Sequence, residues 1–114
     1  IHSLPESHLF MLLEAGKKHE LQDVVCHTGG GATNSAVSFA RLGFEVSSFF
    51  KIGNDASGKA ILDELTANNV NTQYVIKTDK ANTGTSFVIP YPSGERSTLT
   101  HRGANASLTQ EELP

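Results

Sequence analysis

The sequence predicts an α/β fold, in which a mostly parallel β-sheet is covered by helices and carries a β-hairpin as an appendage. Two observations support this fold class. First, strand-like and helix-like runs alternate along most of the chain, which is the pattern of a parallel sheet with helical crossovers. Second, two later strand-like runs flank a Pro-Ser-Gly-Glu turn, which favours a hairpin.

The first third of the chain predicts one ambiguous segment, one strand and one helix. Residues 8–21 are apolar enough for a short helix that is stopped or bent at a glycine. Residues 21–28 contain adjacent β-branched valines and predict a strand. Residues 32–43 predict a helix, because their apolar side chains share one face and Gly43 is a natural C-terminal stop.

The middle of the chain repeats the alternation of strand and helix. Residues 45–53 predict the next strand, and residues 56–69 predict a helix whose leucines and isoleucine form one buried stripe. A third strand is predicted over residues 73–77. This β-α-β-α-β order is the basis for expecting a parallel sheet.

The last third predicts the hairpin and a final helix. Residues 83–91 and 96–102 form the two strands, and the prolines near the turn mark a sheet edge. Residues 103–113 predict a helix, in which Thr109 and Glu112 have the spacing of a capping box.

Composition excludes several function classes. The chain has 114 residues and a formal net charge of −3, which suits one domain and argues against a nucleic-acid or membrane-surface binder. Its single cysteine, Cys26, excludes an internal disulfide and a Cys-rich zinc site, and a cytoplasmic location is expected. The histidines show no metal-ligand spacing, so no metal site is predicted from them.

Two glycine-rich turns invite nucleotide-binding interpretations. The first turn has Gly29 and Gly31 in the spacing of a dinucleotide-binding loop. However, Asn34 stands where a small residue should permit close packing, and Lys51 stands near the position of the expected acidic residue. A plain structural turn rarely needs three successive glycines, and an amide at Asn34 is suited to bind hydroxyl groups.

The second turn, residues 53–60, reads "GNDASGKA" and matches all of a P-loop except its last position. Ala60 replaces the hydroxyl residue that binds Mg²⁺, and Asp55 places a carboxylate where phosphate would bind. Asn54 and Asp55 instead predict the start of a helix, with Lys59 solvated on its first turn. The P-loop interpretation is therefore disfavoured.

The run from Gly29 to Ala36, together with Gly43 and Gly53, resembles the N-terminal signature of the ribokinase-like carbohydrate kinases, the PfkB family. The signature combines glycines and small residues with an asparagine and two further glycines at set distances, and each position fits. Later stretches, including "TGTSFVIPYPSGERS" and "RGANASLTQEEL", are also similar to this family. The resemblance extends from about residue 20 to the end of the chain.

This resemblance implies a partial doubly wound, Rossmann-like sheet of the ribokinase type with a small β-lid. Residues 1–114 would form a single incomplete domain, with lid strands at about residues 22–28 and 84–101. The whole enzyme would transfer the γ-phosphate of ATP, with Mg²⁺, to a hydroxyl group of a sugar, sugar acid or nucleoside. The lid would also form the interface of a homodimer.

The resemblance also implies substrate-binding residues. The signature residues would hold sugar hydroxyls, and Thr83, Thr85 or Arg102 would approach the sugar from the lid side. Arg102 is of interest for acidic or phosphorylated sugars, although it is equally suited to be a surface arginine. The predicted substrate-binding residues are Gly29, Gly30, Gly31, Thr33, Asn34, Thr85 and Arg102.

One departure from the family pattern matters for catalysis. The family's catalytic aspartate lies in a G-A-G-D motif, which does not occur in this sequence, so no catalytic residue is assigned. The expectation is a fragment that is inactive alone and that carries the sugar-binding half of a kinase. The alternative is a non-catalytic sugar-binding or interaction module.

Overall fold

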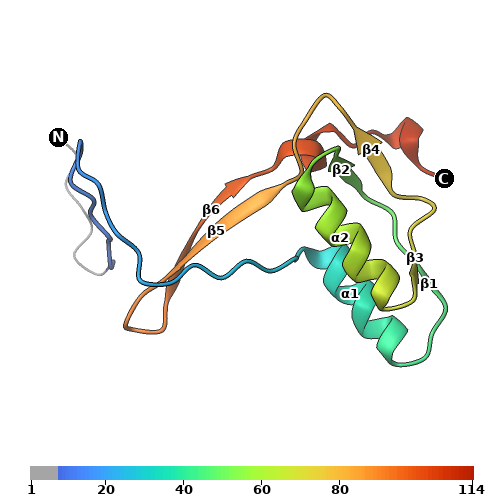
Figure 1. The fold of residues 1–114 in the computed structure, drawn as a ribbon, viewed down its shortest axis with the longest axis horizontal. Helices are drawn as coiled ribbons and strands as arrows, with labels where there is room; N and C mark the ends of the chain where they lie inside the picture. Colours follow the sequence, from blue (N-terminus) through green and yellow to red (C-terminus); the bar gives the residue numbers. More distant parts are fainter. Residues whose placement is uncertain (1–7) are drawn as a thin grey trace.

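The computed structural model describes residues 8–114, so the first seven residues of the predicted domain lie outside the described part. Two α-helices pack together beside short parallel strands, and a long hairpin projects from this body (Figure 1). The elements are α1 (Gly31–Arg41), β1 (Val46–Ser47), β2 (Lys51–Gly53), α2 (Ala56–Ala67), β3 (Val70–Asn71), β4 (Ile76–Thr78), β5 (Thr85–Pro90), β6 (Arg96–His101) and the 3₁₀ helices η1 (Gly103–Ser107) and η2 (Gln110–Glu112).

The parallel arrangement predicted from the sequence is present. Strand β1 pairs with β3 and β2 pairs with β4, both in parallel, and Ile52 aligns with Lys77 in the second pair. The strand predicted over residues 45–53 is thus two short strands with different partners. They remain connected, because the Ser48 N–H donates to Asn71 and the Phe50 carbonyl accepts from Ile76.

The core lies between the two helices and the first strand pair. Leu65 of α2 is fully buried and packs with Ala36 and Val37 of α1 and with Val70 of β3. Burial of one leucine side chain contributes about 1.5–3 kcal/mol to the free energy of unfolding. The small residues on α1 let the two helices approach, which explains the alanine-rich face of the predicted helix.

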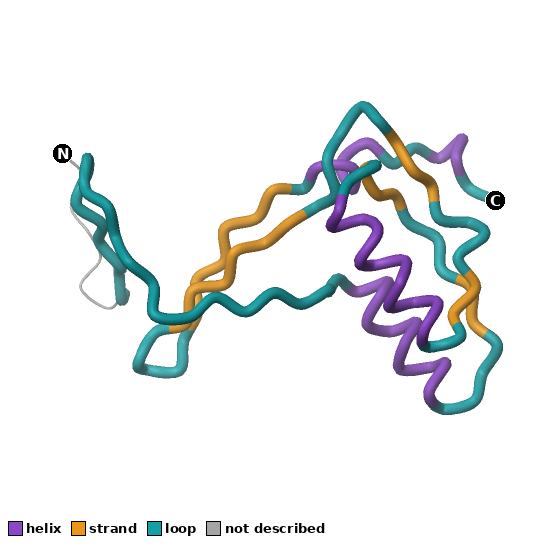
Figure 2. The backbone as a smooth tube through the Cα atoms, viewed as in Figure 1, coloured by secondary structure: helices purple, strands orange, loops and turns teal. Residues whose placement is uncertain are grey.

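The predicted hairpin is confirmed. Strands β5 and β6 are antiparallel, with Thr85 opposite His101 and Phe87 opposite Leu99. At its tip, the Gly94 N–H donates to the Tyr91 carbonyl, and Gly94 has a φ of 90°, which favours glycine. The hairpin extends away from the helices (Figure 2), so most of its side chains are exposed.

Two predicted elements are absent from residues 8–30, which contain neither helix nor strand. The helix predicted over residues 8–21 does not form; Gly16 has a φ of 75°, and a helix this short is marginal without a packing partner. The strand predicted over residues 21–28 does not form either, and Val24 and Val25 are exposed. A strand needs a partner for its ladder of hydrogen bonds, and this segment has none within the described chain.

The final predicted α-helix is instead two 3₁₀ turns, η1 and η2. The predicted capping box between Thr109 and Glu112 is present, and its Glu112 carboxylate accepts from the Thr109 N–H at 3.0 Å. The same carboxylate oxygen lies 3.0 Å from Lys51 Nζ, which also donates to the Ser107 carbonyl. Lys51 therefore ties both 3₁₀ turns back to β2.

The molecule is more extended than a compact domain of its length. Its radius of gyration is 17.8 Å, whereas a compact domain of this size has about 13 Å. The hairpin and the segment before α1 account for the extension (Figure 1). No helix within residues 8–114 combines the length and apolar character that crossing a membrane requires.

Candidate functional site

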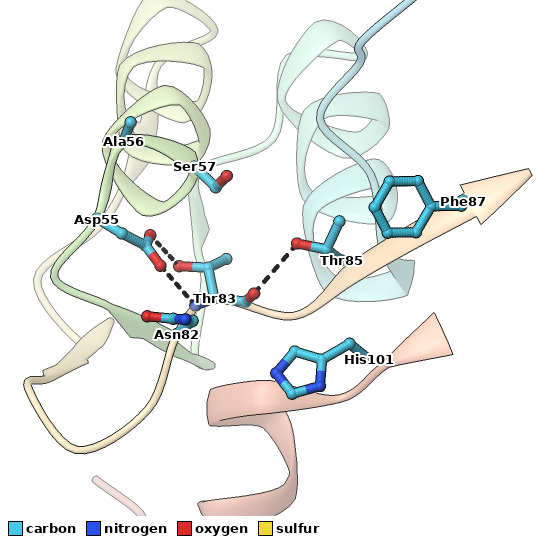
Figure 3. A pocket seen from close by; sticks show the side chains of 8 residues that line it. All are labelled: Asp55, Ala56, Ser57, Asn82, Thr83, Thr85, Phe87 and His101. Atoms are coloured by element: carbon cyan, nitrogen blue, oxygen red, sulfur yellow. Dashed lines mark hydrogen bonds between the residues drawn. The ribbon is translucent and has the colours of Figure 1, made fainter. Parts of the chain in front are cut away.

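The hairpin joins the body at Thr83, a buried residue that is clamped by Asp55. Asp55 caps α2, since its Oδ1 accepts from the Gly58 N–H at 2.8 Å, as the sequence predicted. The same oxygen accepts from the Thr83 hydroxyl at 2.6 Å, and Oδ2 accepts from the Thr83 N–H at 2.8 Å. The Gly53 N–H in turn donates to Thr83 Oγ1 at 3.0 Å. Figure 3 shows Thr83 between Asp55 and Thr85.

These contacts explain the glycines of the "GNDASGKA" stretch. A Cβ on Gly53 would lie 2.5 Å from the Ala81 carbonyl oxygen, and one on Gly58 would lie 2.5 Å from the Gly53 carbonyl oxygen. Real side chains do not tolerate such distances, so both positions require glycine for packing. Lys59 is on the surface and pairs with Asp63. The Asp55 carboxylate occupies the helix N-terminus that a P-loop would offer to phosphate.

A cavity of about 280 Å³ lies between the first turn of α1 and the base of the hairpin. Gly30 precedes α1 with a φ of 104°, a conformation that favours glycine. On the hairpin side, Gly84 approaches the Asn105 amide so closely that any Cβ would collide with it. The residues that line this glycine-lined cavity are Gly29, Gly30, Gly31, Ala32, Thr33, Phe50, Lys51, Ile52, Ile61, Thr83, Gly84 and Asn105.

A second cavity, of about 490 Å³, lies where α2 begins and the hairpin leaves the body (Figure 3). Thr85 and His101 face each other across the hairpin register and lie on its rim with Phe87. The remaining lining residues are Asp55, Ala56, Ser57, Asn82 and Thr83. Thr83 lines both cavities and is the residue that connects them.

The structure brings together only part of the predicted substrate set. Gly29, Gly30, Gly31 and Thr33 line the glycine-lined cavity, and Thr33 is 5% exposed. Asn34 is exposed and does not line it. Of the three residues predicted on the lid side, Thr83 lines the same cavity, and the other two lie apart from it. Thr85 lines the second cavity, and Arg102 is exposed and lines neither.

Sequence reasoning named Thr83 but missed Lys51 and Asn105, which also line the glycine-lined cavity. Asn105 lies within η1 and Lys51 on β2, and both reach the cavity with the glycines. Ala104 next to Asn105 is fully buried, and its N–H donates to the Asn82 carbonyl at 2.7 Å, which fixes η1 against the hairpin base. No local sequence pattern predicts this contact, because it joins segments that are far apart in the sequence.

Two carboxylates at the site are stabilised in the charged form. The Thr83 hydroxyl, and then the N–H groups of Thr83 and Gly58, hold the pKa of Asp55 below its usual range. The hydrogen bond from Lys51 lowers the pKa of Glu112. The Glu112 carboxylate thereby balances the charge of Lys51 beside the glycine-lined cavity.

The described residues do not supply a metal centre. Within residues 8–114, no three His, Cys, Asp or Glu side chains lie close enough together to hold a metal ion. Phosphoryl transfer requires Mg²⁺, a phosphate-binding loop and a base. The part of the chain that the structure describes therefore offers a binding cavity without a metal cluster of this kind.

Comparison with known proteins identifies the family. The model of the pfkB family carbohydrate kinases matches residues 4–114. A ribokinase from Staphylococcus aureus (strain COL) is 32% identical over 85 residues, which cover 75% of this chain and 28% of that protein. A 2-dehydro-3-deoxygluconokinase from Bacillus subtilis (strain 168) is 32% identical over 109 residues, which cover 93% of this chain and 34% of that protein.

A solved structure agrees with this assignment. The structure of an uncharacterised sugar kinase from Pyrococcus horikoshii in complex with ATP superposes with a TM-score of 0.71 and 31% identity, over 88% of this chain and 34% of that one. This chain thus spans about a third or less of the length of these proteins. The fold is of the ribokinase type, and the chain belongs to the pfkB family of carbohydrate kinases.

Proposed function

We propose that the whole protein is an ATP-dependent sugar kinase and that this chain supplies its sugar-binding part. The observation that carries the proposal is the glycine-lined cavity, where the predicted glycines and Thr33 converge with Gly84 and Asn105. The reaction would move the γ-phosphate of ATP to a hydroxyl group of a sugar, sugar acid or nucleoside. Ribokinases among the relatives support the sugar as phosphate acceptor.

The cavity has the properties that a small polyol requires. Its volume of about 280 Å³ is near the lower end of the usual range for ligand pockets, roughly 300–1,000 Å³, so it suits a monosaccharide. The first turn of α1 directs free backbone N–H groups toward bound oxygen atoms. The Asn105 amide can donate to and accept from hydroxyl groups. Asn34 remains a predicted ligand that would reach the sugar from the edge of the cavity.

The chemical step is assigned to other parts of the whole protein. Neither a G-A-G-D motif in the sequence nor a metal-binding cluster in residues 8–114 is present. We therefore propose that the 114-residue chain alone is inactive and that ATP and Mg²⁺ bind mainly to residues outside it. The related sugar kinase structure in complex with ATP supports ATP as the donor.

The hairpin is proposed to be a lid over the sugar and to form the subunit interface of a homodimer. Its exposed apolar residues include Phe87, Val88 and Leu99, which are 64%, 53% and 61% exposed. Exposed apolar side chains on a free strand edge favour association with a second sheet. We expect no nucleic-acid or membrane partner, and a cytoplasmic enzyme.

Arg102 supports a sugar acid as a second candidate substrate. It is exposed beside Gly103, where the hairpin returns to the body, and its guanidinium group can bind a carboxylate. The related 2-dehydro-3-deoxygluconokinase is consistent with this candidate. Loss of activity toward the acid alone in an Arg102→Ala variant would support it.

The experiment is a substrate panel on the full-length protein, in which ADP release is followed with ribose, fructose, a nucleoside and 2-keto-3-deoxygluconate. Phosphorylation of at least one of them, dependent on Mg²⁺, is expected. If the pure, folded protein binds a sugar but releases no ADP with any, the non-catalytic sugar-binding module becomes the better account.

A further inference from the structure

We infer that Asp55 is a positioning residue, which acts through Thr83 to hold the hairpin in the orientation that closes the glycine-lined cavity. The inference rests on the proposed sugar kinase function. It assigns to Asp55 a role beyond capping α2, although Asp55 itself does not line the glycine-lined cavity.

The clamp fixes Thr83 through both its backbone and its side chain. One carboxylate oxygen accepts the Thr83 hydroxyl at 2.6 Å, and the other accepts the Thr83 N–H at 2.8 Å. The Thr83 hydroxyl oxygen also accepts from the Gly53 N–H at 3.0 Å. Three hydrogen bonds on one residue, which is 4% exposed, leave its peptide little freedom to rotate.

Thr83 is also the point from which the hairpin departs. Gly84 follows it and β5 begins at Thr85, whose hydroxyl donates to the Thr83 carbonyl at 3.2 Å. The hairpin returns beside the same point, because the Ala104 N–H donates to the Asn82 carbonyl. Both ends of the hairpin are therefore attached to the segment that Asp55 holds.

The clamp is coupled to the glycine-lined cavity by close packing. Thr83, Gly84 and Asn105 form its hairpin-side wall. A Cβ on Gly103 would collide with the Asn82 carbonyl, so the returning strand has no room to shift toward the clamp. A displacement of Thr83 would move this wall relative to the three glycines at the start of α1, Gly29 to Gly31, and the sugar would no longer fit the cavity.

Two substitutions separate positioning from helix capping. In Asp55→Asn the amide oxygen can still accept from Gly58 and from the Thr83 hydroxyl, because asparagine is a good N-cap. Its NH₂ group would however face the Thr83 N–H. Both groups are donors, so they cannot form a hydrogen bond with each other. Thr83→Ser keeps the hydroxyl and the clamp, whereas Thr83→Val removes both hydroxyl bonds. Lys59→Ala, on the exposed face of α2, is the matched control.

The test is steady-state kinetics of the full-length protein with its best sugar, together with hydrogen exchange. Asp55→Asn and Thr83→Val should raise the KM for sugar about tenfold, equivalent to about 1.4 kcal/mol, and leave the KM for ATP unchanged. Thr83→Ser should raise the KM for sugar less than Thr83→Val does, because it keeps the hydroxyl, and Lys59→Ala should resemble wild type. Amides of the hairpin, residues 84–101, should exchange faster in Asp55→Asn while those of α2 keep their protection.

Opposite results would overturn the inference. It fails if Asp55→Asn deprotects α2 as much as the hairpin, or if both KM values rise together, because either result indicates general destabilisation. An unchanged sugar KM with normal hairpin exchange would also refute it. If the wild-type protein phosphorylates no sugar, the proposed function fails. The positioning role is tested separately, because unaltered hydrogen exchange of the hairpin in Asp55→Asn would refute it whether or not the protein is a kinase.

Discussion

Asp55 and Thr83 are joined by two hydrogen bonds that use both oxygens of the carboxylate, at 2.6 Å from the hydroxyl and 2.8 Å from the N–H. The two residues are far apart in sequence but connect the start of α2 to the base of the hairpin. In this way a helix cap, which is local in origin, also fixes a tertiary junction beside the glycine-lined cavity.

Replacement of Gly53 by alanine should destabilise the whole protein. The added Cβ would lie 2.5 Å from the Ala81 carbonyl oxygen and 2.8 Å from the Thr83 nitrogen, and neither backbone atom can move freely. Overpacking of this kind costs about 1–3 kcal/mol, measurable as the free energy of unfolding in urea.

Gly29→Ala is the control for this substitution, because nothing lies within 4 Å of a Cβ at that position. Its free energy of unfolding should stay within about 0.5 kcal/mol of wild type. Equal destabilisation by the two variants would contradict the packing explanation of Gly53.

The Asp55 clamp should make stability depend on acid pH. The folded pKa of Asp55 is lowered below 3.8, mainly by the Thr83 hydroxyl. The unfolded chain therefore takes up a proton first as the pH falls. The clamp contributes its full stability above pH 3.8, and this contribution is lost as the pH falls through the folded pKa.

Urea unfolding of wild type and Asp55→Asn between pH 2.5 and pH 7 measures this effect. Wild type should lose its advantage over the variant at the acid end of the range, while the two curves run parallel near neutrality. A constant difference at every pH would show that the carboxylate charge does not matter.

Asn105→Ala should weaken sugar binding and leave the fold intact. Its side chain lines the glycine-lined cavity and is not part of the buried core, so removal costs hydrogen bonds to the ligand, roughly 0.5–1.5 kcal/mol. Titration calorimetry should therefore show a several-fold weaker Kd for the sugar, with ATP binding unaffected. Ser107→Ala, in the same 3₁₀ turn but outside the cavity, should bind the sugar normally.

The sequence predicted best what is determined locally. Asp55 caps α2 because a carboxylate beside a helix start binds its free N–H groups, and the hairpin forms around a turn whose residues favour it. The resemblance to a known family singled out the three glycines and Thr33, which line one cavity, and their role as sugar ligands stays a prediction. These features need no knowledge of distant segments.

The sequence was a poorer guide wherever the structure depends on contacts with distant segments. Residues 21–28 have the composition of a strand but no ladder to join in the described chain. Thr33 and Asn34 were predicted together, but adjacent helix positions point about 100° apart, so only Thr33 lines the cavity, and the ligand role of Asn34 stays a prediction. Asn105 and the Thr83 clamp depend on contacts between distant segments, which no single-sequence pattern contains.

The most direct test of the account is hydrogen–deuterium exchange of the full-length protein with and without the sugar that it phosphorylates fastest. We predict that saturating sugar slows exchange at residues 29–34 and at 83–85 and 103–105, which surround the glycine-lined cavity. Protection confined to other parts of the protein, with these three segments unchanged, would contradict the assignment of this cavity as the sugar site.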